Sequence, residues 1–206
     1  MQKLYLVRHG ESEWNNLKRI QGQKDTFLTF KGEKQAEKIA NRLVSEEIDI
    51  IYSSDLKRAN ETANIIGEKL NLQVTPSEAF REIKFGSWEG LSTEELTEKN
   101  SEEHFIWLNQ PHNFKMDGAE TLYEVQKRAM NKIDSILKSN PNKNILVVSH
   151  GATIKTIILG YVGIDLKYYN RMTLNNTSLS IIEFRDRNNV IKLLNDTCHL
   201  EEDKYE

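Results

Sequence analysis

The sequence contains only one cysteine and three prolines, and it has no long apolar run. A single cysteine, Cys198, cannot form an intramolecular disulfide, and chains without disulfides are typical of reducing compartments. No segment approaches the apolar length that a membrane span needs. Arg8 and Glu11 interrupt the N-terminal apolar stretch too early for a signal peptide. We therefore expect a cytoplasmic protein that does not contact membranes.

An excess of charge of one sign is also missing. The chain has 28 Lys and Arg against 31 Asp and Glu, a net charge of -3, so nothing indicates a nucleic-acid partner. There is no GxxxxGK(S/T) loop and no Gly-rich nucleotide fingerprint, which argues against a kinase. With 206 residues, 38% hydrophobic and 29% charged, and no linker, the chain is expected to form one globular domain over residues 1–206.

Short runs of β-strand character alternate with segments of helical periodicity. The strand-like runs are Leu4–Val7, Ile48–Ser54, Leu72–Thr75 and Asn144–His150, followed by a closing hairpin of Ser178–Phe184 and Val190–Asn195. The helical segments follow the N-cap candidate Thr29, begin at Asp55, and recur over Leu122–Leu137 and Ala152–Leu159. Residues 91–116 are polar and aromatic and predict short helices and loops. The pattern predicts an α/β three-layer sandwich with a mostly parallel sheet flanked by helices.

Ligands of such sheets bind beyond the carboxyl ends of the strands, so the residues that follow each strand are candidates for a site. In chain order these are Arg8, His9 and Gly10; Ser53, Ser54 and, one helical turn later, Arg58; Arg81 and Glu82; and Ser149, His150 and Gly151. Two histidines, at least two arginines and a carboxyl group are therefore expected at one edge of the sheet.

This combination of side chains suits phosphoryl transfer. Arg8, Arg58 and a protonated His150 would bind a dianionic phosphate and stabilise its oxygens during transfer. A neutral His9, with one ring nitrogen held by a main-chain carbonyl at the Gly10 turn, could attack phosphorus. Glu82 would protonate the leaving oxygen and then deprotonate the attacking water.

Other interpretations of the same residues remain open at this level. Each histidine or arginine, taken alone, is more often a surface or structural group than a functional one. A metal site of His9, His150 and Glu82 would place two arginines against a cation, and no HExxH motif is present. Acidic neighbours should raise the pKa of Cys198 and make it inert. The three other histidines lie in polar segments and are expected to be solvated: His104, His112 and His199.

The segment LVRHGESEWN resembles the signature of the histidine phosphatase superfamily, which includes the cofactor-dependent phosphoglycerate mutases. The resemblance extends over almost the whole chain and preserves the order of the family's motifs. The matching segments are RIQGQKDTFLTFKGEKQA, IYSSDLKRANETANII, REIKFGSWEG and ILVVSHG.

The resemblance implies a phosphoglycerate mutase-like fold with a short cap insertion at about residues 91–120, and no metal or organic cofactor. It implies that His9 is the phosphorylated nucleophile and Glu82 the proton donor. It also implies a phosphate pocket lined by Arg8, Asn15, Arg58 and His150, with Gln21 and Gly22 reaching the substrate or phosphate and the Gly151 main chain beside His150. The partner is then a small phosphate monoester, bound by a monomer or a homodimer.

A phosphatase and a mutase would share this pocket. The mutases carry a longer, basic segment between the acid motif and the second histidine, whereas residues 91–122 here are acidic and aromatic and contain no arginine. This stretch resembles the cap of the broad-specificity phosphatases, although GAETL (Gly118–Leu122) stands where they usually have GES. We favour the hydrolase, with a phosphoglycerate mutase and a non-catalytic phosphate binder as alternatives. Five apolar residues could either wall the pocket or pack the cap on the core: Trp88, Phe105, Trp107, Phe114 and Met116.

Overall fold

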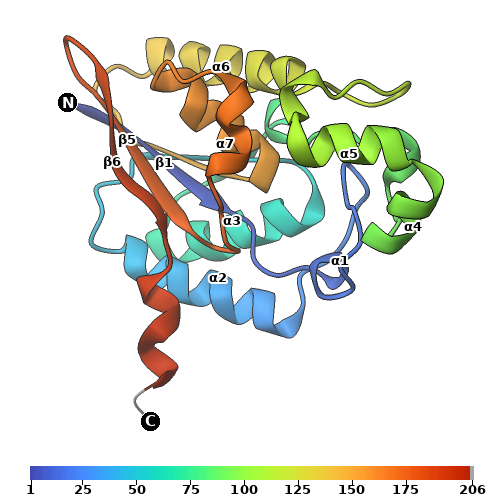
Figure 1. Ribbon diagram of the computed structural model, residues 1–206. Helices are drawn as coiled ribbons and strands as arrows, with labels where there is room; N and C mark the ends of the chain where they lie inside the picture. Colours follow the sequence, from blue (N-terminus) through green and yellow to red (C-terminus); the bar gives the residue numbers. More distant parts are fainter. Residues whose placement is uncertain (205–206) are drawn as a thin grey trace.

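A computed structural model describes residues 1–204 and shows a single six-stranded sheet between two layers of helices (Figure 1). The strands are β1 (Gln2–Arg8), β2 (Ile50–Ser53), β3 (Val74–Pro76), β4 (Ile145–Ser149), β5 (Leu179–Phe184) and β6 (Asn189–Asp196). Their order in the sheet is β3-β2-β4-β1-β5-β6. The first four run parallel, and the C-terminal hairpin of β5 and β6 adds two antiparallel strands at one edge.

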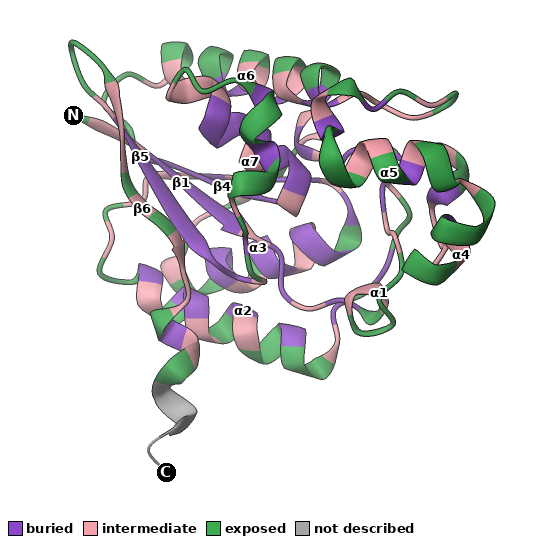
Figure 2. Cartoon of the chain, in the orientation of Figure 1, coloured by how far each residue is buried: buried purple, intermediate pink, exposed green. Residues whose placement is uncertain are grey.

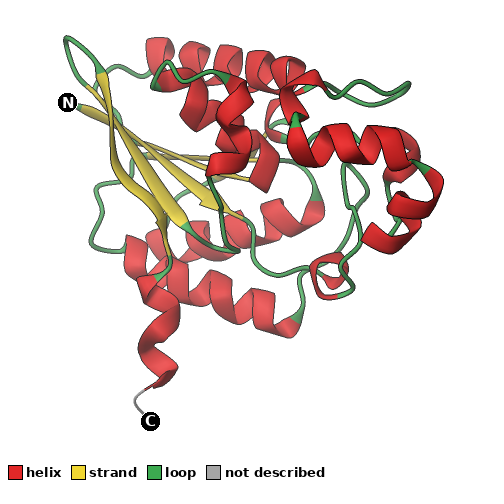
Figure 3. Cartoon of the chain, in the orientation of Figure 1, coloured by secondary structure: helices red, strands yellow, loops and turns green. Residues whose placement is uncertain are grey.

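Helices α2 and α3 cover one face of the sheet, and α6 and α7 cover the other (Figure 3). The α-helices are α1 (Glu13–Asn16), α2 (Phe30–Leu43), α3 (Lys57–Leu70), α4 (Thr93–Lys99), α5 (Ser101–Asn109), α6 (Leu122–Ser139) and α7 (Gly151–Tyr161). The 3-10 helices are η1 (Glu78–Phe80), η2 (Gly86–Trp88), η3 (Pro111–Asn113), η4 (Leu166–Arg171) and η5 (Cys198–Lys204). None of the helices within residues 1–204 is long and apolar enough to cross a bilayer.

Strand β4 forms the centre of the core. All five of its residues are buried, and it pairs in parallel with β2 on one side and β1 on the other (Figure 2). Because side chains alternate along a strand, Ile145 and Val147 pack toward α6 and α7, whereas Leu146 and Val148 pack toward α2 and α3. The predicted three-layer α/β sandwich, with its central strand buried on both faces, is confirmed.

Two element boundaries differ from the sequence prediction for identifiable reasons. Helix α3 begins at Lys57 rather than Asp55, because Leu56 keeps an extended N-cap backbone and the Asp55 carboxylate accepts a 2.8 Å hydrogen bond from Arg81 Nε. Strand β3 begins at Val74 rather than Leu72, because the Leu72 N–H donates to the Gly67 carbonyl at the end of α3. Its last residue, Pro76, is tolerated because β3 lies at the edge of the sheet.

The expectation that the remaining histidines are solvated is wrong for two of them. His104 is 6% exposed and lies edge-on to Trp88, with their ring centroids 6.0 Å apart, because α5 turns this face toward the core. His199 is also buried, and its Nε2 is 3.3 Å from the hydroxyl of Thr177. Both histidines lie in short helices. Such helices bury too few residues for a helical hydrophobic periodicity to show in the sequence.

The loop after β1 passes within backbone contact of α2. A Cβ atom on Gly10 would lie 2.5 Å from the Gly32 carbonyl oxygen, and a Cβ atom on Gly32 would lie 2.0 Å from the Glu11 carbonyl oxygen. Gly32 follows the N-cap Thr29, whose side chain accepts a 3.0 Å hydrogen bond from the Gly32 N–H, as the sequence predicts for this cap. A side chain at either position would collide with the neighbouring backbone, so both residues must be glycine.

We expect Gly32→Ala to lower the free energy of unfolding by about 1–3 kcal/mol, because the added methyl group has no space against the backbone of the β1 loop. In an open helical position the same change would stabilise the protein, since alanine has the higher helix propensity. Urea unfolding at constant m value measures the difference, with Lys34→Ala on the exposed side of α2 as the control. A Gly32→Ala protein as stable as wild type would contradict the close contact.

Candidate active site

The parallel strands bring the two predicted histidines together. His9 follows β1 and His150 follows β4, and the His9 N–H donates to the Ser149 carbonyl at 2.9 Å. The centroids of the two imidazole rings are 5.1 Å apart. The neighbouring strand β2 continues into Ser54, whose N–H donates to the Val148 carbonyl at 2.9 Å. The ends of β1, β2 and β4 thus form one edge with both imidazoles on it.

His9 is oriented by its own loop. Its side chain is 2% exposed, and Nδ1 lies 2.7 Å from the Gly10 carbonyl oxygen, which can only accept. The proton is therefore on Nδ1, and Nε2 has its lone pair available. Burial, together with the charges of Arg58 and Arg8, lowers the pKa of His9 well below the usual value. The bond to a main-chain carbonyl at Gly10 that the sequence predicts is present, and it leaves a neutral imidazole.

The two arginines are held by main-chain carbonyls. Arg58 is 1% exposed and donates to the carbonyls of Gly22 and Lys24, both at 2.8 Å. Arg8 donates through Nη1 to the Leu174 carbonyl at 2.6 Å. Burial lowers the pKa of Arg8, and burial together with Arg8 lowers the pKa of Arg58 to about 10. These bonds fix both guanidinium groups, and no carboxylate within residues 1–204 forms a direct ion pair with either.

His150 differs from the expectation of a protonated ring. Its side chain is fully buried, and neither ring nitrogen has a hydrogen-bond partner among the described residues. Burial and the charges of Arg58 and Arg8 lower its pKa well below the usual value, so the imidazole is neutral in the unliganded pocket. An arriving anion would reverse this effect, because negative charge favours the protonated ring.

Glu82 is held against the first turn of α7. Its Oε1 accepts from the N–H groups of Ile83 at 3.0 Å and Thr153 at 3.2 Å, and its Oε2 accepts from Ala152 at 3.2 Å. A Cβ atom on Gly151 would lie 3.8 Å from Glu82 Oε2 and 3.7 Å from Arg8 Nε. The carboxyl group predicted from the third strand end therefore faces the guanidinium that follows the first.

The loop after β1 contributes the remaining predicted residues. The Oδ1 atom of Asn15 accepts from the Ser12 backbone N–H and from the Asn176 side chain, both at 3.2 Å, so its amide nitrogen is left to donate. The Oε1 atom of Gln21 accepts from the hydroxyls of Ser12 and Thr26, both at 2.8 Å, which likewise leaves its nitrogen as a donor. Ser12 thus orients both amides.

Gly22 lies in the left-handed region, with φ +52, and a Cβ atom there would lie 2.1 Å from Glu89 Oε1. That carboxylate accepts from the N–H groups of Gln23 at 3.0 Å and Phe85 at 3.1 Å. Glu89 therefore joins the loop of residues 21–24 to the segment that carries Glu82, and only glycine fits between them.

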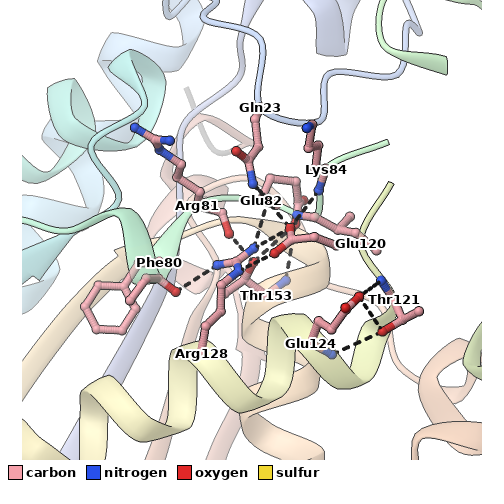
Figure 4. Close-up of polar contacts among 12 residues, drawn as sticks. Gln23, Phe80, Arg81, Glu82, Lys84, Glu120, Thr121, Glu124, Arg128 and Thr153 are labelled. Atoms are coloured by element: carbon pink, nitrogen blue, oxygen red, sulfur yellow. Dashed lines mark hydrogen bonds and ion pairs between the residues drawn. The ribbon is translucent and has the colours of Figure 1, made fainter. Parts of the chain in front are cut away.

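Sequence reasoning missed a polar cluster behind Glu82 (Figure 4). Arg128 on α6 donates to the Glu82 carbonyl at 3.1 Å and to the Ala79 carbonyl at 2.8 Å, and its Nε is 2.8 Å from Glu120 Oε1. Gln23 donates to the same Glu82 carbonyl at 3.0 Å and to Glu120 Oε2 at 3.2 Å. Glu120 belongs to the GAETL segment. The departure of this segment from the usual GES is the one feature of the sequence that points to this cluster.

Several other candidates lie outside the pocket. The side chain of Arg81 forms an ion pair with Asp55. Trp88 and Phe114 are fully buried in the core under α4 and α5, whereas Phe105 is 62% exposed, so the packing interpretation holds for the first two. Cys198 is exposed, and Asp196 raises its pKa as predicted.

Several buried donors at the strand ends lack partners among the described residues. Among the described residues, the Nε atoms of Arg8 and Arg58 and both ring nitrogens of His150 are buried and make no hydrogen bond. Such groups are costly unless a ligand satisfies them. A compact anion with several oxygens, such as a phosphoryl group, fits this need. In the part of the chain that the structure describes, no three His, Cys, Asp or Glu side chains gather in a way that could hold a metal ion.

Comparisons with known proteins match almost the whole chain. A family model described as "Histidine phosphatase superfamily (branch 1)" matches residues 4–197. The chain is 40% identical to "Phosphoserine phosphatase 1" of Hydrogenobacter thermophilus over 98% of its length and 96% of the relative's. It is 32% identical to "Probable phosphoglycerate mutase GpmB" of Yersinia enterocolitica, over 98% of its length and 96% of the relative's.

Solved structures match at similar coverage. Bacillus stearothermophilus YhfR superposes with a TM-score of 0.93 at 31% identity, covering 98% of this chain and 100% of that one. A phosphoserine phosphatase from Entamoeba histolytica, solved in complex with phosphoserine, has a TM-score of 0.86 at 38% identity, covering 97% of this chain and 100% of that one.

The lowered pKa values of His9 and His150 predict that stability falls in mild acid. An unfolded histidine binds a proton below about pH 6.5, whereas these two remain neutral in the folded chain, so acid favours unfolding by up to ~1.4 kcal/mol per pH unit for each. Urea unfolding at pH 7.5 and 5.5 measures this loss. His150→Gln should lose about 1 kcal/mol less than wild type between the two pH values, and an identical loss would contradict a neutral His150.

Proposed function

The chain belongs to the histidine phosphatase superfamily, and from this we propose that His9 and Glu82 hydrolyse small phosphate monoesters in the pocket at the strand ends. The chain is a phosphomonoesterase of a superfamily that works through a phosphohistidine intermediate. The observation that carries the assignment of residues is the set of buried, unpartnered nitrogens of Arg8, Arg58 and His150 around a neutral His9.

Two chemical steps follow from this arrangement. His9 Nε2 attacks phosphorus, the bond between phosphorus and the ester oxygen breaks, and Glu82 donates its proton to the departing alkoxide. Water then attacks the phosphohistidine, Glu82 accepts a proton from it, and the bond between phosphorus and nitrogen breaks to return neutral His9. Arg8, Arg58 and a His150 protonated by the bound anion stabilise the charge on the phosphoryl oxygens.

The surrounding loop completes the proposed pocket. The free amide nitrogens of Asn15 and Gln21 donate to the phosphoryl group or the substrate, and the Gly22 carbonyl holds Arg58 in place. Gly151 leaves space for substrate beside His150, Arg8 and Glu82. Residues 91–120 form the cap of the single domain. The enzyme acts in the cytoplasm as a monomer or homodimer, without a nucleic-acid partner.

Phosphoserine is the proposed substrate. The relative from Hydrogenobacter thermophilus bears this activity in its name, and the Entamoeba histolytica structure contains phosphoserine. A second candidate function, phosphoglycerate mutase, is favoured by the name of the Yersinia enterocolitica relative. The acidic and aromatic character of residues 91–122 supports the phosphatase, because a mutase must retain its phosphorylated intermediate and residues 91–122 contain no arginine to do so.

We expect His9→Ala to reduce hydrolysis of p-nitrophenyl phosphate by at least about 1,000-fold, because the first bond to phosphorus cannot form. Rapid acid-free quenching with labelled substrate should trap acid-labile phosphate on wild type and none on His9→Ala. His112→Ala, which changes a histidine outside the pocket, is the control and should keep normal turnover. Normal activity of His9→Ala would overturn the mechanism.

A product assay separates the two functions. With 3-phosphoglycerate and a catalytic amount of 2,3-bisphosphoglycerate, we expect inorganic phosphate as the product, because a phosphatase transfers the phosphoryl group from His9 to water. Release of inorganic phosphate and formation of 2-phosphoglycerate are measured in the same reaction. A predominance of 2-phosphoglycerate would replace the phosphatase with the mutase.

A further inference from the structure

Lys155 presents a cation that the described residues do not neutralise. It lies on α7, one helical turn after Gly151, and its side chain is partly buried. Its Nζ lies 4.5 Å from the centre of the Tyr169 ring. No hydrogen bond or ion pair joins Nζ to any of the described residues. A partly buried ammonium that lies against an aromatic ring has lost hydration without gaining a hydrogen-bonded counter-ion.

This cation is beside the proposed phosphate pocket. Residues four apart on a helix share a face, so Lys155 lies on the side of α7 where Gly151 approaches Arg8 and Glu82. Burial and the charge of Arg8 lower the pKa of Lys155, while the charge of Glu82 raises it. The same two charges act on the phenol of Tyr169, whose pKa is raised chiefly by burial.

Aromatic packing limits where the ammonium can go. Tyr169 is buried in η4, and its ring lies 5.7 Å from that of Trp107 on α5. Packing against Trp107 thus fixes the Tyr169 ring that contacts Lys155. A cation held in this way binds a ligand anion at little further cost in side-chain entropy.

We propose that Lys155, positioned on the ring of Tyr169, binds a carboxylate of the substrate and makes the enzyme selective for phosphate monoesters of short carboxylic acids. The inference rests on the proposed function, because Arg8 and Arg58 must already hold the phosphoryl group. One ammonium supplies a single charge and matches one carboxylate, whereas the arginine forks match the several oxygens of a phosphoryl group. The carboxylate would also replace the counter-ion that Lys155 lacks.

Two pairs of substrates differ in the carboxylate and test the proposal. Phosphoserine is compared with phosphoethanolamine, which lacks only the carboxylate, and 3-phosphoglycerate with glycerol 3-phosphate, in which a hydroxymethyl group replaces it. Wild type should have the higher kcat/KM on the carboxylated member of each pair. Lys155→Met should lower that value by about 10- to 100-fold, mostly through KM, and change the value for the other member by less than about twofold.

Lys167→Met is the matched control, because Lys167 is an exposed lysine whose Nζ lies 5.1 Å from the ring of Tyr168 in the same 3-10 helix. It should leave all four kcat/KM values unchanged, and Lys155→Arg should retain most of the preference for carboxylates. Equal losses on both members of a pair, or a wild type that turns over both members equally, would overturn the role of Lys155 while leaving the phosphatase assignment intact. Activity that survives in His9→Ala would instead reject the proposed function.

Discussion

Buried positive charge that main-chain carbonyls hold in place is the constraint on which this site depends. Arg58 is almost completely buried, and its guanidinium is held by carbonyl oxygens rather than by a carboxylate. Carbonyls orient a guanidinium without cancelling its charge, so burial and, next to it, the charge of Arg58 lower the pKa values of His9 and His150. The neutral imidazole of the proposed nucleophile and the proposed anion-binding site are therefore two consequences of the same arrangement.

The fold positions these charges through backbone contacts. The carboxyl ends of β1, β2 and β4 bring His9, Arg58 and His150 close together. The contact between Gly10 and Gly32 fixes the loop that orients His9. Glu82 comes from a segment without regular structure, so it needs support from elsewhere. The first turn of α7 holds its carboxylate, and Arg128 with Gln23 holds its carbonyl. Helices on opposite faces of the sheet thus support Glu82 and the loop that carries His9.

The segment between the acid motif and α6 connects the proposed phosphate site with the proposed selectivity for carboxylated substrates. Its buried Phe114 packs, together with Trp88 of the acid motif, in the core cluster that also contains Tyr169. Because Tyr169 contacts Lys155, the same packing that attaches this segment also places a cation near the pocket. A substitution in this cluster could therefore alter substrate preference without touching the residues that bind the phosphoryl group.

The sequence alone determined the three-layer fold and nominated the residues of the proposed site. A short apolar run such as Ile145–Val148 between helical segments favours a strand covered on both faces, and polar residues that follow parallel strands meet at one end of the sheet. It did not determine that Arg81 would bind Asp55, that His104 and His199 would be buried, or that Arg128, Glu120 and Gln23 would hold the Glu82 carbonyl. Those contacts join residues distant in sequence through side-chain geometry, which leaves no periodic signal. The protonation of His150 is decided in the same way, because its pKa depends on burial and on the arginines that tertiary structure places around it.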